Sequence, residues 1–127
     1  MKTKPLLIFS SSLELATGIA VIAAPNLIAN LLFSAGLTRA GEAIGRVGGF
    51  GLFSLAIATW PRRAGDHTQS TSALFVYNLM AACYLAYLRL SGEFNGLLLA
   101  IACVLHGLLA VLFLRPVYET VANKGSA

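Results

Sequence analysis

Charged side chains are scarce in this sequence. Asp, Glu, Lys and Arg make up 11% of its 127 residues, whereas hydrophobic residues make up 57%. Soluble domains carry about 25% charged residues, so the composition excludes an ordinary water-soluble surface. The net charge of +4 comes from basic residues at the ends of apolar runs, without the basic stripe of a nucleic-acid-binding protein. We therefore expect a lipid bilayer with anionic headgroups, and not nucleic acid, as the partner.

Catalytic motifs are absent, and cysteine is rare. The sequence has no P-loop, no G-x-S-x-G, no H-E-x-x-H and no glycine-rich dinucleotide turn. Its two cysteines, Cys83 and Cys103, lie within apolar runs and form no C-x-x-C, which excludes an extracellular disulfide framework. Cys103 and His106 are too few ligands for a metal or haem site. We therefore expect no metal and no cofactor, and favour a protein that is not an enzyme.

Long apolar runs are what the sequence does contain. A membrane-spanning helix needs about 20 mostly apolar residues, and four stretches have this length: residues 6–24, 42–60, 72–90 and 96–114. The first run is longer than the apolar region of a signal peptide, so we expect it to be retained. The sequence predicts an all-α fold in which four transmembrane helices form a bundle, with a single domain over residues 1–127.

A shorter apolar segment, residues 25–33, lies between the first two predicted spans. Pro25 suits the first turn of a helix, and the leucine and isoleucine side chains would share a face opposite two asparagines. Because the segment is too short to cross a bilayer, we predict an interfacial helix that lies in the headgroup plane. At the other end of the chain, the residues after Arg115 and Pro116 are expected to fray.

Lysine and arginine are distributed unevenly between the two sides of such a bundle. With four spans, the termini and the second loop share one side, which carries most of the basic residues: Lys2, Lys4, Arg62, Arg63, Arg115 and Lys124. The other side carries Arg39 and Arg89. Since cytoplasmic loops are enriched in lysine and arginine, both termini are predicted to be cytoplasmic.

Five polar side chains stand out within the predicted spans: Glu14, Arg46, Asn78, Tyr84 and His106. An ionisable group in hydrocarbon costs about 2.5–3.5 kcal/mol on insertion scales, so each requires a partner. One interpretation is a mid-membrane cluster that binds a proton, an ion or a small polar ligand. The other is structural: the charges pair, and His106 bonds to a hydroxyl or carbonyl group and thereby fixes helix register. We favour the structural interpretation, and the functional one stays open.

Two of these groups also have neighbours on their own helix. Glu42 lies four residues before Arg46 on the same face, which favours a local ion pair. Tyr77 and Tyr84 share one face of the third span, and we expect both to face protein, where their hydroxyls find acceptors. Asn78 is expected to bond within this group or across to another helix.

Glycines recur at every fourth position of the second span, at Gly41, Gly45 and Gly49. Such ladders of small residues let two helices approach closely. We favour packing of this face within the monomer, and homodimerisation through it is the alternative.

Several polar and glycine-containing segments follow in a characteristic order: residues 13–18 (LELATG), residues 41–48 (GEAIGRVG), Tyr77-Asn78, Gly92-Glu93 and His106. In these segments the chain resembles a group of small four-helix bacterial inner-membrane proteins that are distantly similar to DoxX-like proteins. The resemblance implies a bacterial plasma membrane and a four-helix bundle. It carries no established active site, although DoxX relatives are linked with membrane redox assemblies.

Together these features predict a non-catalytic integral membrane protein. Its short loops leave no soluble domain for chemistry, so we expect an accessory or interaction subunit that packs against another membrane protein or a second copy of itself. One alternative is a protein that binds a proton or a small molecule through the polar cluster. Another is a quinone- or thiol-linked redox protein that uses Cys83 and Cys103, which an antiparallel helix pair would bring to similar depth.

Overall fold

Five helices form most of the chain in the computed structural model, which describes residues 3–62 and 67–124. In order they are α1 (Thr3–Ala23), α2 (Pro25–Phe33), α3 (Arg39–Thr59), α4 (Thr68–Leu90) and α5 (Leu97–Lys124). The described residues contain no strand, which confirms the predicted all-α class. The short helix after the first span also begins at Pro25, as predicted.

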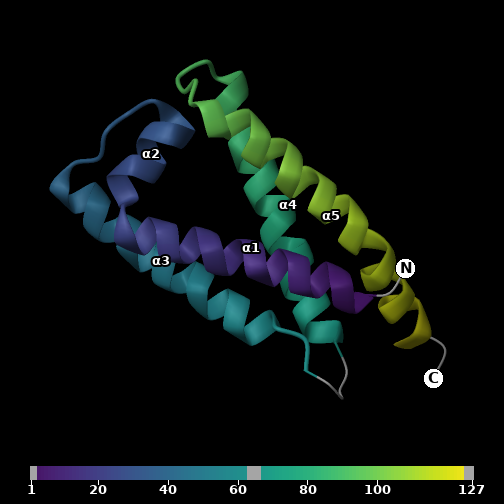
Figure 1. Ribbon diagram of the computed structural model, residues 1–127. Coiled ribbons are helices and arrows are strands. Elements are labelled where there is room, and N and C mark those ends of the chain that lie inside the picture. The colour runs from purple at the N-terminus through teal and green to yellow at the C-terminus, as the bar shows by residue number, and fades with distance from the viewer. Residues whose placement is uncertain (1–2, 63–66, 125–127) are drawn as a thin grey trace.

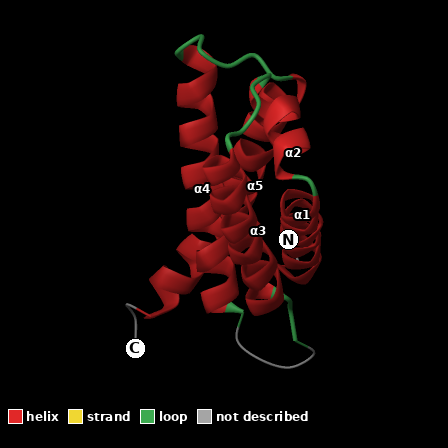
Figure 2. Cartoon of the chain, turned by 90° about the vertical axis from the view of Figure 1, so that its left-hand side faces the viewer, coloured by secondary structure: helices red, strands yellow, loops and turns green. Residues whose placement is uncertain are grey.

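The four long helices form two antiparallel pairs. α1 packs along α3, and α4 packs along α5 (Figure 1). Figure 2 shows α1 nearly end-on while α4 runs up the picture, so the first pair crosses the second steeply. Contacts between the pairs are far fewer than contacts within them. The arrangement therefore differs from the predicted bundle, in which all four helices would lie side by side.

Three of the described helices are long and apolar enough to cross a membrane: α1, α4, and α5 over Leu97–Glu119. The prediction of four spans is thus shown only for three. α3 has the same length as α1, but its first turns carry Arg39, Glu42 and Arg46, and it contains five glycines. A mostly apolar run of sufficient length predicted a span here, whereas the charges near the start of α3 and its glycines make it less apolar than α1 and α5.

α5 continues past its predicted end. The span was expected to stop at residue 114 with a frayed tail, but the helix runs through Pro116 to Lys124. Arg115 Nε donates to Glu119 Oε1 at 2.8 Å, one turn apart across the proline. A proline removes one backbone donor from a helix, and ion pairs at this spacing stabilise exposed helical turns. The sequence prediction gave too much weight to the proline.

Gly18 and Gly49 set the distance between α1 and α3. A Cβ at Gly18 would lie 2.8 Å from the backbone nitrogen of Phe53 and 3.0 Å from the carbonyl oxygen of Gly49. A Cβ at Gly49 would lie 2.9 Å from the carbonyl oxygen of Gly18. Gly45, another of the glycines at every fourth position, packs against α2, because a Cβ there would lie 3.3 Å from Pro25. The two backbones therefore pack closer than any side chain would allow.

A buried hydroxyl pair joins the same two helices nearer the start of α1. The Ser11 and Thr59 side-chain oxygens lie 2.8 Å apart, and both residues are buried. Thr59 donates its hydroxyl hydrogen to the carbonyl oxygen of Leu55 at 2.8 Å. Because a hydroxyl has one hydrogen to donate, Ser11 is the donor to Thr59. This bond fixes the register of α1 against α3.

Gly96 lies where α2 meets the start of α5. Its backbone is so close to the carbonyl group of Leu32 that a Cβ would overlap that group. Beside it, the rings of Phe33 and Phe94 pack edge to face with centroids 5.2 Å apart. Glycine is therefore required at this position by close backbone approach.

Replacing Gly96 with alanine should push α2 away from α5. We expect a loss of about 1–3 kcal/mol in the free energy of unfolding, the usual cost of overpacking. Gly107→Ala, also on α5, is the matched control, because a Cβ there meets its nearest atom at 4.0 Å. Thermal melting of both variants in one detergent measures the difference. Equal melting temperatures would contradict the close contact at Gly96.

Candidate functional site

Polar side chains from three helices meet where α1 crosses α4 and α5. They are Ser10, Glu14, Tyr77, Asn78 and His106, and we call this group the polar junction. Ser10, Glu14 and Asn78 are buried, while Tyr77 and His106 are half-buried. Buried polar groups of this kind usually require hydrogen-bond partners, and the junction supplies most of them from within itself.

Asn78 connects the three helices. Its Nδ2 donates to the carbonyl oxygen of Leu74 in its own helix at 2.8 Å and to Ser10 Oγ on α1 at 3.4 Å. Its Oδ1 lies 2.8 Å from Nδ1 of His106 on α5. An amide oxygen only accepts, so His106 Nδ1 carries the hydrogen and donates. Asn78 thus uses both its donors and its acceptor, and it fixes the tautomer of the imidazole.

Tyr77, the neighbour of Asn78 on α4, links the remaining two groups. Its hydroxyl forms a side-chain hydrogen bond with the carboxyl group of Glu14. Its ring meets the His106 ring edge-on, with centroids 5.7 Å apart and an angle of 83° between the planes. Two consecutive residues of α4 therefore both reach α1 and both contact the same histidine.

Glu14 retains an acceptor that the junction does not use. The residue is 1% exposed, and its Oε1 has less than 1 Å² of accessible surface and no hydrogen-bond partner among the described residues. Glu14 thus belongs to a polar group whose other buried side chains are bonded, yet one of its own oxygens is buried without a partner. An ionised carboxylate in such surroundings costs several kcal/mol.

Arg46 was predicted to join this cluster but lies elsewhere. Its Nη1 is 3.5 Å from Oε2 of Glu42, and its side chain is 45% exposed. The neighbouring Gly45 packs against Pro25 at the start of α2, whereas Glu14 lies near the middle of α1. Arg46 therefore pairs with Glu42 on its own helix, as the spacing of four residues allowed, and not with Glu14.

Tyr84 also lies outside the junction, although we expected it to face protein. It is 63% exposed and stacks on Tyr87, with ring centroids 6.3 Å apart. Tyr84 is about two turns beyond Tyr77 on nearly the same stripe of α4. Because α1 crosses α4 at the level of Asn78 and then diverges from it (Figure 1), α1 does not cover Tyr84. Helical periodicity thus grouped the two tyrosines correctly, but only one of them lies at the crossing.

The two cysteines are separate from the junction. Cys83 is exposed and Cys103 is half-buried, and both are free thiols. The Sγ of Cys103 donates to the carbonyl oxygen of Ala82 on the facing helix at 3.8 Å. Among the described residues, the hydrogen bond of Cys103 goes to Ala82 and not to the polar junction.

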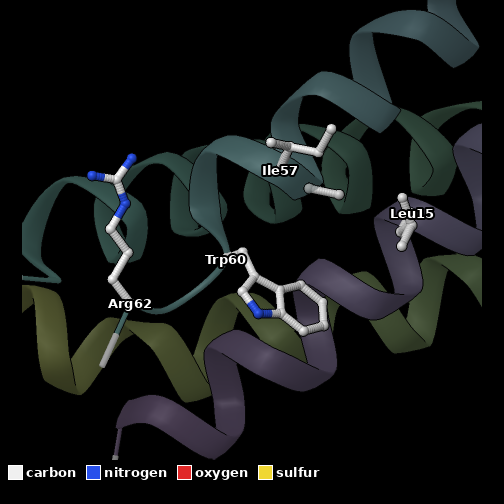
Figure 3. A pocket seen from close by; sticks show the side chains of 5 residues that line it. Leu15, Ile57, Trp60 and Arg62 are labelled. Atoms are coloured by element: carbon white, nitrogen blue, oxygen red, sulfur yellow. The ribbon is translucent and has the colours of Figure 1, made fainter. Parts of the chain in front are cut away.

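A groove of about 320 Å³ lies between α1 and the end of α3. Its lining consists of Leu15, Ala56, Ile57, Trp60 and Arg62. Figure 3 shows the Trp60 indole extending toward α1, while the Arg62 guanidinium points away from it. A tryptophan followed by a basic residue at a helix end is typical of a membrane interface.

Ser10 and Tyr77 are members of the junction that the sequence analysis did not assign to the cluster. Ser10 precedes Glu14 by four residues, so helical spacing places both on one face of α1. That signal was available in the sequence. The level at which α1 crosses α4 was not, because periodicity identifies a face but not the point where two faces meet.

No model of a protein family, no characterised protein and no solved structure matches this sequence. A functional proposal must therefore come from the polar junction and from the exposed faces of the helices.

Proposed function

We propose that this protein is a non-catalytic integral membrane protein that acts as an interaction subunit, packing against another membrane protein or a second copy of itself. The distribution of side chains supports the proposal. Polar groups of α1, α4 and α5 converge inside the molecule, whereas the outward faces carry many large apolar residues. Apolar surface of this extent is unfavourable in water and typical of contact with lipid or protein.

In this proposal α3 is the fourth span, and α2 lies in the headgroup plane. α3 has 21 residues, a length of about 31 Å at 1.5 Å per residue, and a hydrocarbon core is about 30 Å thick. Its Glu42–Arg46 pair is near one end, within reach of the headgroups. Transmembrane helices tilt by up to about 40°, so both crossed pairs can span the same bilayer. The lysine and arginine distribution and the DoxX-like resemblance favour a bacterial inner membrane with cytoplasmic termini.

The outer face of α3 supports a helical partner. No described atom lies within 4 Å of where a Cβ would sit on Gly48 or Gly51. Ile44 and Val47 are exposed beside them. Small residues flanked by branched ones form a surface against which another transmembrane helix packs closely. This face is distinct from Gly49, which contacts α1.

Native mass spectrometry in a mild detergent tests the proposal. We expect the wild-type protein as a homo-oligomer or bound to another membrane protein, and the variant Gly48→Leu/Gly51→Leu as a monomer, because the leucines remove the smooth surface. Val76→Leu, at an exposed position of α4, should leave the assembly unchanged. A wild-type particle that is strictly monomeric and has no partner would contradict an interaction subunit.

Binding of a proton or a small molecule at the polar junction is a second candidate function. The observation that favours it is Oε1 of Glu14, an acceptor buried without a partner among the described residues. Ionisable groups inside membrane segments mark binding sites and proton relays more often than chance. Glu14→Gln should then change binding while the protein remains folded. A variant that shows only a lower melting temperature would indicate a structural glutamate.

A further inference from the structure

We propose that Glu14 is a proton-binding site at the polar junction, and that α1 stays packed against α4 and α5 only while this carboxyl group is neutral. The inference deepens the second candidate function and rests on it. It names the proton as the ligand and the crossing of the two helix pairs as the element that responds.

The space at Glu14 fits a proton and nothing larger. Its Oε1 has less than 1 Å² of accessible surface, so neither a water molecule nor a metal ion fits against it in this packing. Cations also need several oxygen ligands around them. A proton needs no volume, and a carboxylic acid that carries one is neutral.

No compensating charge faces Glu14 from the helices packed around it, as far as these are described. The Ser11–Thr59 bond places Ala56 of α3 opposite Glu14, and Ala56 is apolar and buried. α4 presents Tyr77 and Asn78, which are not cations. α5 presents His106, whose Nδ1 is directed at Asn78.

Loss of the proton would leave a buried carboxylate with Tyr77 as its hydrogen-bond donor. A buried charge without a partner is strongly unfavourable. Because the two helix pairs make few contacts with each other, we expect them to separate and thereby expose the charge. Separation of α1 from α4 would admit water to the carboxylate. The packed state is therefore favoured at low pH and is lost as the pH rises.

Infrared spectroscopy of the protein in lipid vesicles tests the protonation state. At neutral pH we expect the carbonyl band of a neutral carboxylic acid in the wild-type protein and its loss in Glu14→Gln. Glu42→Gln is the matched control and should retain the band, because Glu42 is partly exposed and paired with Arg46. Tyr77→Phe should shift the band to higher frequency, since the carboxyl group loses a hydrogen bond. An ionised Glu14 at neutral pH would overturn the inference.

Spin labels on the two helix pairs test the response. Ser12 on α1 and Met80 on α4 are exposed positions, and they can be labelled in a Cys83→Ser/Cys103→Ser background. We expect the distance between the two labels to lengthen over the same pH range in which the infrared band of the neutral carboxylic acid disappears. Glu14→Gln, which stays neutral, should keep the short distance at every pH. Equal pH-dependent opening in both proteins, or no opening in the wild type after the band is lost, would refute the coupling.

These results separate this inference from the broader proposals. A Glu14 that is ionised at neutral pH excludes proton storage in the packed state, but it does not bear on the interaction-subunit proposal. The oligomeric state is measured independently and is unaffected by either result.

Discussion

Replacing Gly49 with valine should separate α1 from α3 and lower the free energy of unfolding by about 3 kcal/mol or more, at the upper end of overpacking costs. The reason is geometric. A Cβ at this position would lie 2.8 Å from Cγ1 of Ile22 and 2.9 Å from the backbone oxygen of Gly18. The backbone of α1 cannot move aside without breaking the Ser11–Thr59 bond, which fixes the same pair of helices.

The adjacent glycine is the matched control for this substitution. Gly48→Val has the same effect on helix propensity, yet no described atom lies within 4 Å of its Cβ position. Unfolding of both variants as detergent-solubilised monomers, titrated with a denaturing detergent and followed by circular dichroism, gives the two free energies. If Gly48→Val is as costly as Gly49→Val, the loss comes from backbone propensity and the close contact with α1 is not what limits this position.

Replacing Asn78 with leucine should have the second large effect. Leucine has a similar volume, so the packing is nearly preserved while three hydrogen bonds are lost. The buried Ser10 and Nδ1 of the half-buried His106 then lose this partner, and a buried group left without a partner costs about 1–3 kcal/mol. We expect a total loss of about 2–4 kcal/mol in the free energy of unfolding, on the same scale. The exposed Asn30→Leu should change it by a few tenths at most.

A double-mutant cycle with His106 separates the bond from general disruption. When Asn78 and His106 are both replaced with leucine, neither residue retains a polar group that has lost the other as its hydrogen-bond partner. The double variant should therefore be more stable than the sum of the single losses predicts, by about 1 kcal/mol or more. Strict additivity would show that the 2.8 Å contact between them does not stabilise the junction.

Much of the secondary structure could be predicted from hydropathy and local rules. Pro25 predicted the start of α2, and the i, i+4 spacing allowed the Glu42–Arg46 pair that the structure contains. Glu14, Asn78 and His106 were predicted to need partners, because each is a polar group in an apolar run. In the structure these three residues, from α1, α4 and α5, belong to the same polar junction.

What could not be predicted depends on how helices cross. Hydropathy does not specify an angle, so the steep crossing of α1 over α4 was missed, and with it the exclusion of Tyr84 from the junction. The close approach at Gly96 likewise joins two segments whose contact no local pattern encodes. Only three of the four predicted spans are apolar enough in the structure, because α3 carries charges and glycines near its start.

In the proposed arrangement hydrocarbon surrounds these helices, and the accessibility of spin labels tests this most directly. Single labels at Ile19, Val76 and Val104, exposed positions of α1, α4 and α5, can be measured in lipid vesicles against oxygen and against a water-soluble nickel chelate. We predict high accessibility to oxygen and low accessibility to nickel at all three positions. Nickel accessibility at these positions as high as that of a label on a soluble protein would contradict the membrane-spanning arrangement and the proposals built on it.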